Sequence, residues 1–198
     1  MIPYILYLGI IAVCSLIISV VATLTTAIPF MSCFGYSWLA IVAVVLVDAI
    51  TATACRLLPK KCANHEKKFF TVTKKEKNFY EKLKIRKWKD LVPEIGQFTG
   101  FRKNKLENPQ SVEYIERFLL EACYGEIGHF TSFFTGFLIL LFFPLFEGWL
   151  IFSIPVAFIN LLMNMPSYFI LRYNTYKLEV LRTSLLKKQR RAEVKKEA

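Results

Sequence analysis

Positive charge is missing from the first 55 residues of the chain, which contain neither lysine nor arginine. A secretory signal peptide begins with a basic stretch and continues into a short apolar core. Here the apolar run starts at Ile2 without a basic residue before it, and it is longer than such a core. The sequence therefore argues against a signal peptide and for a first membrane span.

Paired cysteines are missing as well. The five cysteines form no Cys-x-x-Cys pair and no other metal-ligand spacing. An odd, scattered set predicts neither disulfides nor a zinc site. We expect reduced cysteines that act as small packing residues, namely Cys14, Cys33, Cys55, Cys62 and Cys123.

Long apolar runs dominate the chain instead. Of the 198 residues, 55% are hydrophobic and 15% are aromatic. Four segments come close to the roughly 20 residues that a helix needs to cross about 30 Å of hydrocarbon. We predict an all-α integral membrane protein with about four transmembrane helices, near Ile2–Ala27, Trp38–Leu58, Phe130–Phe146 and Trp149–Leu171.

The basic residues indicate how these spans are oriented. All 26 lysines and arginines lie in two segments, Arg56–Arg117 and Arg172–Lys196. By the positive-inside rule both segments are cytoplasmic, so a multi-pass protein of the cell membrane with both termini inside is predicted. The net charge of +11 suits anionic membrane lipids, and nucleic acid is not an expected partner.

Four parts of the chain follow from this pattern. We expect a two-span N-terminal hairpin over 1–58 and a basic, partly interfacial cytoplasmic segment over 59–118. A second two-span hairpin over 119–171 and a polybasic tail over 172–198 complete the chain. The second hairpin carries most of the candidate functional residues.

The segment that enters the third span is the first candidate site. On a helix of about 100° per residue, Glu121, Glu126 and His129 lie within an arc of roughly 140°. Ionisable groups inside a membrane are costly and are usually functional. The alternative is a helix end whose acids lie in the lipid headgroup region.

This segment also carries two local patterns. Asn108-Pro109 is a typical helix start, and the apolar residues from Val112 to Ala122 recur at helical spacing. Gly128, Ser132 and Gly136 recur every four residues, which favours close approach of another helix.

Polar residues inside the other spans are the second set of candidates. Asp48 lies near the middle of the second span, on the same face as Thr51. It either has a function or is protonated or hydrogen bonded to a neighbouring threonine. In the fourth span, Asn160 and Asn164 share a stripe about 60° wide, and we expect them to hold a polar part of a substrate.

The basic segments supply the third set of candidates. Basic residues flank a tryptophan in the first of these segments, namely Arg86, Trp88 and Lys89. This pattern is typical of a site that binds lipid phosphates or the phosphates of a soluble donor. Arg172-Tyr173-Asn174 follows the fourth span directly. Those residues either bind substrate or belong to the interfacial belt of aromatic and basic residues.

These motifs resemble those of one family. Arg86-Lys87-Trp88-Lys89, Glu121 with Glu126-Ile127-Gly128-His129, Asn164-Met165-Pro166 and Arg172-Tyr173-Asn174 occur in order. They are similar to motifs of the glycosyl-4,4'-diaponeurosporenoate acyltransferases, membrane enzymes that esterify a fatty acyl chain onto the sugar of a glycosylated carotenoid. The resemblance runs from about Val47 to Leu181.

Two positions depart from the family pattern. Gly125 stands where the family tends to have alanine, and Thr175-Tyr176-Lys177-Leu178 replaces an Arg-Pro-Arg-Leu sequence. These differences leave the motif core intact but bear on the acceptor. A glycolipid or polyprenyl-sugar acceptor fits the sequence as well as a carotenoid.

The resemblance implies the chemistry of acyl transfer. His129 is then the general base, Glu126 orients its ring, and Glu121 binds the acceptor sugar. Asn164 is a candidate oxyanion donor. The implied partners are an acyl-CoA or acyl-carrier donor, a lipid-linked sugar acceptor and membrane lipids, with no cofactor and no metal. The implied substrate-binding residues are Arg86, Trp88, Lys89, Asn160, Asn164, Arg172, Tyr173 and Asn174.

Other classes of protein remain open at this stage. Glu126-x-x-His129 is also the spacing of a di-iron ligand pair, but such sites need a second pair, which the sequence lacks. A membrane scaffold or transporter subunit would use Asp48 and the asparagines for helix association. Another membrane lipid transferase, such as a methyltransferase, is the third alternative.

Overall fold

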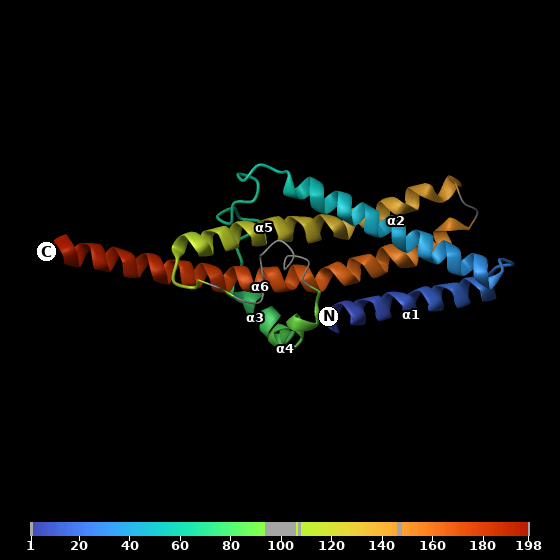
Figure 1. Ribbon diagram of the computed structural model, residues 1–198, viewed down its shortest axis with the longest axis horizontal. Coiled ribbons are helices and arrows are strands. Elements are labelled where there is room, and N and C mark those ends of the chain that lie inside the picture. Colours follow the sequence, from blue (N-terminus) through green and yellow to red (C-terminus); the bar gives the residue numbers. More distant parts are fainter. Residues whose placement is uncertain (1, 94–105, 107, 146–147, 198) are drawn as a thin grey trace. The chain divides into compact units, whose positions relative to one another are not determined.

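The structure is a computed structural model that describes residues 2–93, 106, 108–145 and 148–197. Within these ranges the chain forms helices and no strand (Figure 1). Four helices are long and apolar enough to cross a membrane, which confirms the predicted all-α membrane fold. These candidate spans are Ile2–Thr25, Phe30–Arg56, Val112–Phe142 and Trp149–Lys195.

The helices extend beyond the apolar windows that predicted them. Helix α2 (Phe30–Arg56) starts directly after Pro29, eight residues before the expected Trp38. Helix α5 (Val112–Thr135) continues as the 3-10 helix η3 (Gly136–Leu145), and α6 (Trp149–Glu197) runs on through the basic tail. Hydropathy marks only the apolar part of a helix, whereas lysine, arginine and glutamate continue it in water. Of the predicted third span, Phe146 lies outside the described residues.

The chain folds into two compact units. The first unit comprises the described chain up to Leu57, Leu91–Pro93 and Gly128–Ser167. The second comprises Leu58–Asp90, the described chain up to Ile127, and the chain from Tyr168 onward. Each unit has its own apolar core.

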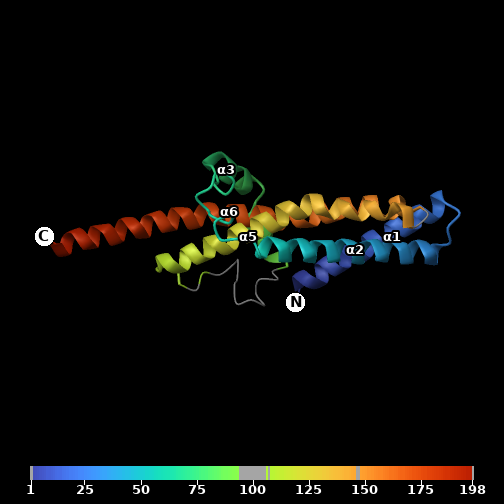
Figure 2. The ribbon, with the colours of Figure 1, turned by 90° about the horizontal axis from the view of Figure 1, so that it is seen from above.

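In the first unit, α1 (Ile2–Thr25) and α2 pack against each other through small polar residues (Figure 2). The hydroxyl of Ser37 lies 2.8 Å from that of Ser15 and 3.1 Å from that of Ser19, and all three side chains are buried. Large side chains such as Ile5 and Leu24 point outward instead. Small residues inside and leucines outside are the arrangement expected for helices packed within lipid.

The rest of the first unit packs α2, η3 and the start of α6 together. Trp149 is buried, and its indole N–H donates to the carbonyl of Ile139 at 2.7 Å, which satisfies the polar atom of a core residue. A Cβ added to Gly136 would lie 2.5 Å from Nδ2 of Asn160, so glycine is needed there for α6 to approach. Ser132 is also buried, whereas a Cβ added to Gly128 would meet no atom of the described residues within 4 Å. Among the described residues, close packing is therefore found at Ser132 and Gly136 of the predicted ridge.

The second unit begins with a loop and three short helical elements. These are α3 (Lys74–Lys82), α4 (Ile85–Trp88) and η1 (Lys89–Leu91). The hydroxyl of Thr73 caps α3 by accepting a hydrogen bond from the Glu76 N–H at 3.2 Å.

The start of α5 corrects one sequence prediction. The cap is Ser111, whose hydroxyl accepts from the Tyr114 N–H at 3.1 Å, and not Asn108. Asn108 instead accepts in a turn closed by the Ser111 N–H. Asn-Pro marks the turn that precedes the helix, and serine provides the better-placed side-chain acceptor.

Two apolar clusters hold the second unit together. Ile115, Phe118 and Leu119 of α5 pack against Leu178 of α6. Cys123 packs with Ala63 and Phe70 of the loop that precedes α3. All five cysteines are free, and Cys33, Cys55 and Cys123 are buried.

Candidate functional site

In the first unit, His129, Asn164, Asn160 and Asp48 form one polar cluster. Nδ1 of His129 lies 2.8 Å from Oδ1 of Asn164. The amide nitrogen of Asn164 donates to Oδ2 of Asp48 at 3.0 Å, and that of Asn160 donates to Oδ1 at 3.3 Å. A carboxylate, two amides and an imidazole from α2, α5 and α6 are thus joined in one chain of hydrogen bonds.

The hydrogen-bond partners that the structure describes for Asp48 are asparagines and not a neighbouring threonine. The carboxylate accepts from two asparagine amides, whereas the neighbouring Thr51 bonds to the hydroxyl of Thr135 at 2.9 Å. The asparagine stripe of the fourth span therefore faces Asp48. The amide nitrogen of Asn164, which the sequence suggested as an oxyanion donor, is directed at this carboxylate.

In the second unit, Arg172 is the centre of a second polar cluster. Its guanidinium forms a bidentate pair with Glu76, at 2.8 Å for each contact. It also donates to Glu126 at 3.2 Å and to the carbonyls of Phe69 and Thr71 at 2.7 and 3.2 Å. The five N–H groups of arginine are thereby all given to acceptors within the protein.

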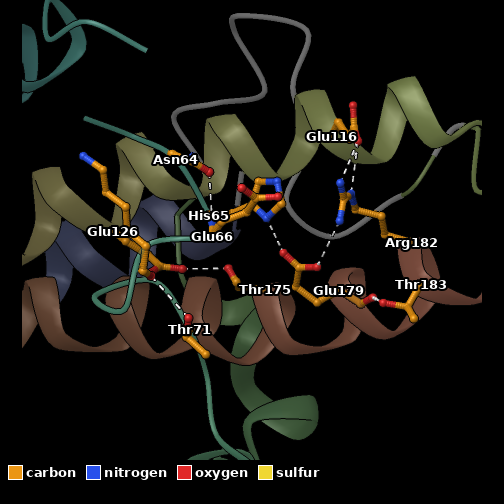
Figure 3. Close-up of polar contacts among 11 residues, drawn as sticks. Asn64, His65, Glu66, Thr71, Glu116, Glu126, Thr175, Glu179, Arg182 and Thr183 are labelled. Carbon is orange, nitrogen blue, oxygen red and sulfur yellow. Dashed lines mark hydrogen bonds and ion pairs between the residues drawn. The ribbon is translucent and has the colours of Figure 1, made fainter. Parts of the chain in front are cut away.

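Glu126 lies at the other side of this cluster and is fully buried. One carboxylate oxygen accepts from Arg172. The other accepts from the hydroxyl of Thr175 at 2.6 Å, and Figure 3 shows this contact. Both departures from the family pattern are found here. Thr175 bonds to Glu126, and a Cβ on the preceding Gly125 would lie 2.8 Å from Leu171.

The charge of Arg172 also affects the pKa of Glu76 in α3. Burial alone would raise the pKa of Glu76, but the hydrogen bonds and charge of Arg172 outweigh it and hold that pKa below its ordinary value. The phenol of Tyr80 donates to Glu76 at 2.7 Å. Burial and this hydrogen bond to a carboxylate raise the pKa of Tyr80.

A basic pocket of about 270 Å³ lies elsewhere in the second unit. Arg86 lines it and donates to the phenol oxygen of Tyr173 at 2.8 Å, while the ammonium of Lys177 lies 3.9 Å from the centre of the Tyr173 ring. The lining residues are Glu81, Lys84, Ile85, Arg86, Lys87 and Tyr173. Three cations against one carboxylate make this pocket attractive to an anion.

The remaining predicted residues are Trp88, Lys89, Glu121 and Asn174. The Trp88 indole donates to the carbonyl of Leu83 at 2.9 Å and so closes the turn before α4. Glu121 and Asn174 are half-buried on α5 and α6, and Lys89 is half-buried in η1. The motifs therefore meet in three pairs, His129 with Asn164, Glu126 with Arg172, and Arg86 with Tyr173.

The structure also reveals residues to which the sequence gave no role. His65 bonds to the carboxylate of Glu179 and lines a pocket of about 650 Å³ (Figure 3). Arg182, which follows on α6, pairs with Glu116 at 3.0 Å. No sequence pattern connects His65 to Glu179, whereas Thr73-x-x-Glu76 is a recognisable capping pattern that locates Glu76.

Comparison with known families gives one match. Residues 65–184 match the model of the family described as glycosyl-4,4'-diaponeurosporenoate acyltransferase. This interval covers more than half of the chain and includes all the motifs from Arg86 to Asn174. It begins after Asp48 and the first two spans. Neither the curated proteins nor the solved structures gave a match.

Proposed function

The chain belongs to the glycosyl-4,4'-diaponeurosporenoate acyltransferase family, and from this premise we propose that it esterifies a sugar hydroxyl of a glycosylated lipid. Family membership makes it an acyltransferase of carotenoid biosynthesis. The acceptor in our proposal is a glycosyl carotenoid or a related glycolipid. The donor is an acyl-CoA or an acyl-carrier thioester.

The hydrogen bond between His129 and Asn164 is the observation that carries the proposed mechanism. When Nδ1–H donates to the amide oxygen, Nε2 keeps its lone pair and can accept the proton of a sugar hydroxyl. The hydroxyl oxygen then attacks the acyl carbon, the carbon–sulfur bond breaks, and the thiol leaves with the proton that the imidazole carried. The ester and the free thiol are the products.

The basic pocket is the proposed site for the phosphates of the donor. Arg86 is held by Tyr173, and Lys84 and Lys87 line the same pocket. Arginine with two lysines can neutralise a diphosphate, and the fork of the guanidinium suits phosphate oxygens. Trp88 and Lys89 continue this basic surface as contacts to the donor or to membrane lipids.

Arg172 takes a different role in this proposal from the one that the sequence suggested. Because its N–H groups are occupied by protein acceptors, we assign it to holding α3, α5 and α6 together in the second unit. Glu126 is its buried counter-ion, and Glu121 stays the proposed contact to the acceptor sugar. Asn174 stays a proposed substrate contact.

The proposed orientation follows from the distribution of charge. Both basic segments face the cytoplasm, where an acyl thioester is available, and both termini lie on that side of the cell membrane. The four candidate spans are consistent with a multi-pass arrangement of this kind.

A transfer assay on the purified full-length chain in lipid vesicles tests the function. Radiolabelled acyl-CoA or acyl-carrier protein is supplied with a glycosyl carotenoid or with a glycosyl diacylglycerol, and labelled ester is measured. We expect ester that depends on both donor and acceptor. If no donor and acceptor pair gives ester, the enzymatic proposal fails and a membrane scaffold becomes the better explanation.

A further inference from the structure

Asp48 lies outside the region that matches the family, in the second span of the N-terminal hairpin. Yet its two carboxylate oxygens accept from the amide nitrogens of Asn160 and Asn164, and Asn164 is bonded to His129. A carboxylate inside an apolar helix is costly, and it is kept where it is paired and used. The structure pairs this one with the side chain that contacts the proposed base.

The contacts fix which way the amide of Asn164 faces. The amide nitrogen of Asn164 donates to Asp48 at 3.0 Å and also lies 3.1 Å from the backbone carbonyl and from the side-chain oxygen of Asn160. A carboxylate and a carbonyl can only accept hydrogen bonds, so the NH2 end of the amide has to face Asp48 and Asn160. The amide oxygen is thereby directed to His129. Since an amide oxygen can only accept, Nδ1 of His129 has to carry the proton, and Nε2 is left with the lone pair.

We propose that Asp48 is a positioning residue that sets the tautomer of His129 through Asn164. This inference rests on the proposed function, in which Nε2 of His129 is the general base. A carboxylate acts in a comparable way when it contacts a catalytic histidine directly. Here an asparagine lies between them, so the carboxylate orients the amide and the amide orients the ring.

Two neighbouring contacts hold Asp48 in this position. One turn further along α2, Thr51 bonds to Thr135 of α5 at 2.9 Å, which fixes α2 against the helix that carries His129. On the opposite side, Gly136 leaves room for the side chain of Asn160, the second amide on the carboxylate. The N-terminal hairpin therefore contributes a residue to the site as well as a membrane anchor.

The test compares Asp48→Ala and Asp48→Asn with Thr51→Val in the full chain reconstituted in lipid bilayers. Thr51→Val is the control, because it removes another hydrogen bond of α2, one turn away from Asp48, which goes to α5 and not to the asparagines of α6. Acyl transfer is measured as kcat and KM. The tautomer of His129 is read from the 15N chemical shifts of histidine-labelled protein, and His65→Gln assigns the signals, since the chain has only 2 histidines.

For Asp48→Ala we expect kcat to fall on the order of 10–100-fold with KM nearly unchanged, as for other residues that orient a functional side chain. The Nδ1–H tautomer should become a mixture of both forms. Asp48→Asn keeps one acceptor oxygen and should fall between Asp48→Ala and the wild type, and Thr51→Val should leave the tautomer unchanged. If Asp48→Ala does not insert, Asp48→Asn carries the test.

The two readouts separate failure of this inference from failure of the proposed function. Wild-type kcat and an unchanged tautomer in both Asp48 variants would overturn the role of Asp48 while leaving the transferase intact. A tautomer that changes in the Asp48 variants, in a protein that makes no ester, would support the positioning role and reject the acyl transfer. Equal loss of kcat in Thr51→Val would reduce Asp48 to a packing residue.

Discussion

Nδ1 of His129 lies 2.8 Å from Oδ1 of Asn164, so two motifs that are 35 residues apart in the sequence meet in one hydrogen bond. The bond joins α5 to α6 within the first unit. His129 is the base of the proposed mechanism, so it is the side chain on which that mechanism is most directly tested.

Replacing His129 by alanine should reduce acyl transfer about 10²–10⁴-fold, because the general base is lost. His65→Ala is the control, since it removes the other histidine, which is paired with Glu179 in the second unit. That variant should retain near wild-type turnover. Both are measured as labelled ester formed by equal amounts of inserted protein. If His65→Ala lost turnover and His129→Ala retained it, His65 would be the base, and the reaction would take place in the pocket that His65 lines.

Arg86→Ala should raise the KM for acyl-CoA and leave kcat nearly unchanged, because it removes a phosphate contact that is equally strong in ground and transition states. Tyr173→Phe should have a smaller effect in the same direction, since it removes the acceptor that holds Arg86. Lys74→Ala, an exposed cation at the start of α3, serves as the control for loss of charge. A KM that rises equally for Lys74→Ala would show a general surface effect in place of a pocket.

Removal of Arg172 should destabilise the protein by about 3–5 kcal/mol, because it leaves Glu126 buried without its counter-ion. Arg172→Lys should be nearly as damaging, since an ammonium has three donors for five acceptor contacts. The measurement is thermal unfolding in a mild detergent. Arg182→Ala is the comparison, because its pair with Glu116 is more exposed and should contribute less than about 1 kcal/mol. Equal effects of Arg172 and Arg182 would contradict the structural assignment.

Stability should fall in acid partly through Glu76. Its pKa is lower in the folded protein than in an unfolded chain, where the pKa of glutamate is about 4.3. The folded state therefore binds this proton less readily, so the contribution of Glu76 is complete above about pH 4.3 and is lost as the pH falls through the folded-state pKa. Glu76→Gln should be less stable at neutral pH and lose less Tm on acidification. A parallel pH dependence in wild type and Glu76→Gln would refute this.

The predicted topology can be tested by cysteine labelling, although not at the native Cys33, which is completely buried. Met31 is 76% exposed in the first turn of α2, and Met31→Cys should react with an impermeant maleimide added to intact cells. Lys60, exposed just after α2, should react as Lys60→Cys only after the membrane is opened. The unsubstituted protein reports background from its own cysteines. Labelling in the opposite sense would invert the proposed orientation.

Much of the fold could be predicted because hydropathy and charge are properties of the chain itself. The four apolar windows located four helices, and the helical spacing of Ile115, Leu119 and Ala122 identified three buried positions. The ends of the helices could be predicted less well from the sequence. Whether α6 stops at Leu171 or continues to Glu197 depends on helix propensity in a charged stretch, to which an apolar window does not respond.

The residue pairs of the site could be predicted only in part. Spacing put Glu126 and His129 on one side of α5, and it suggested that they face each other. The structure bonds Glu126 to Thr175 and Arg172, and His129 to Asn164. Which neighbour a side chain meets depends on how two helices rotate about their axes, and that is set by packing residues such as Gly125 and Leu171.

Arg172 has a consequence for the order in which the protein is made. Its acceptors, from the carbonyl of Phe69 to the carboxylate of Glu126, lie 46 to 103 residues earlier in the chain. Synthesis proceeds from the N-terminus, so these acceptors leave the ribosome first and have to remain hydrated until the arginine follows. The segment between the second and third spans can therefore take its final form only after the fourth helix has been translated, and a nascent chain cut before Arg172 should be open to protease in that segment.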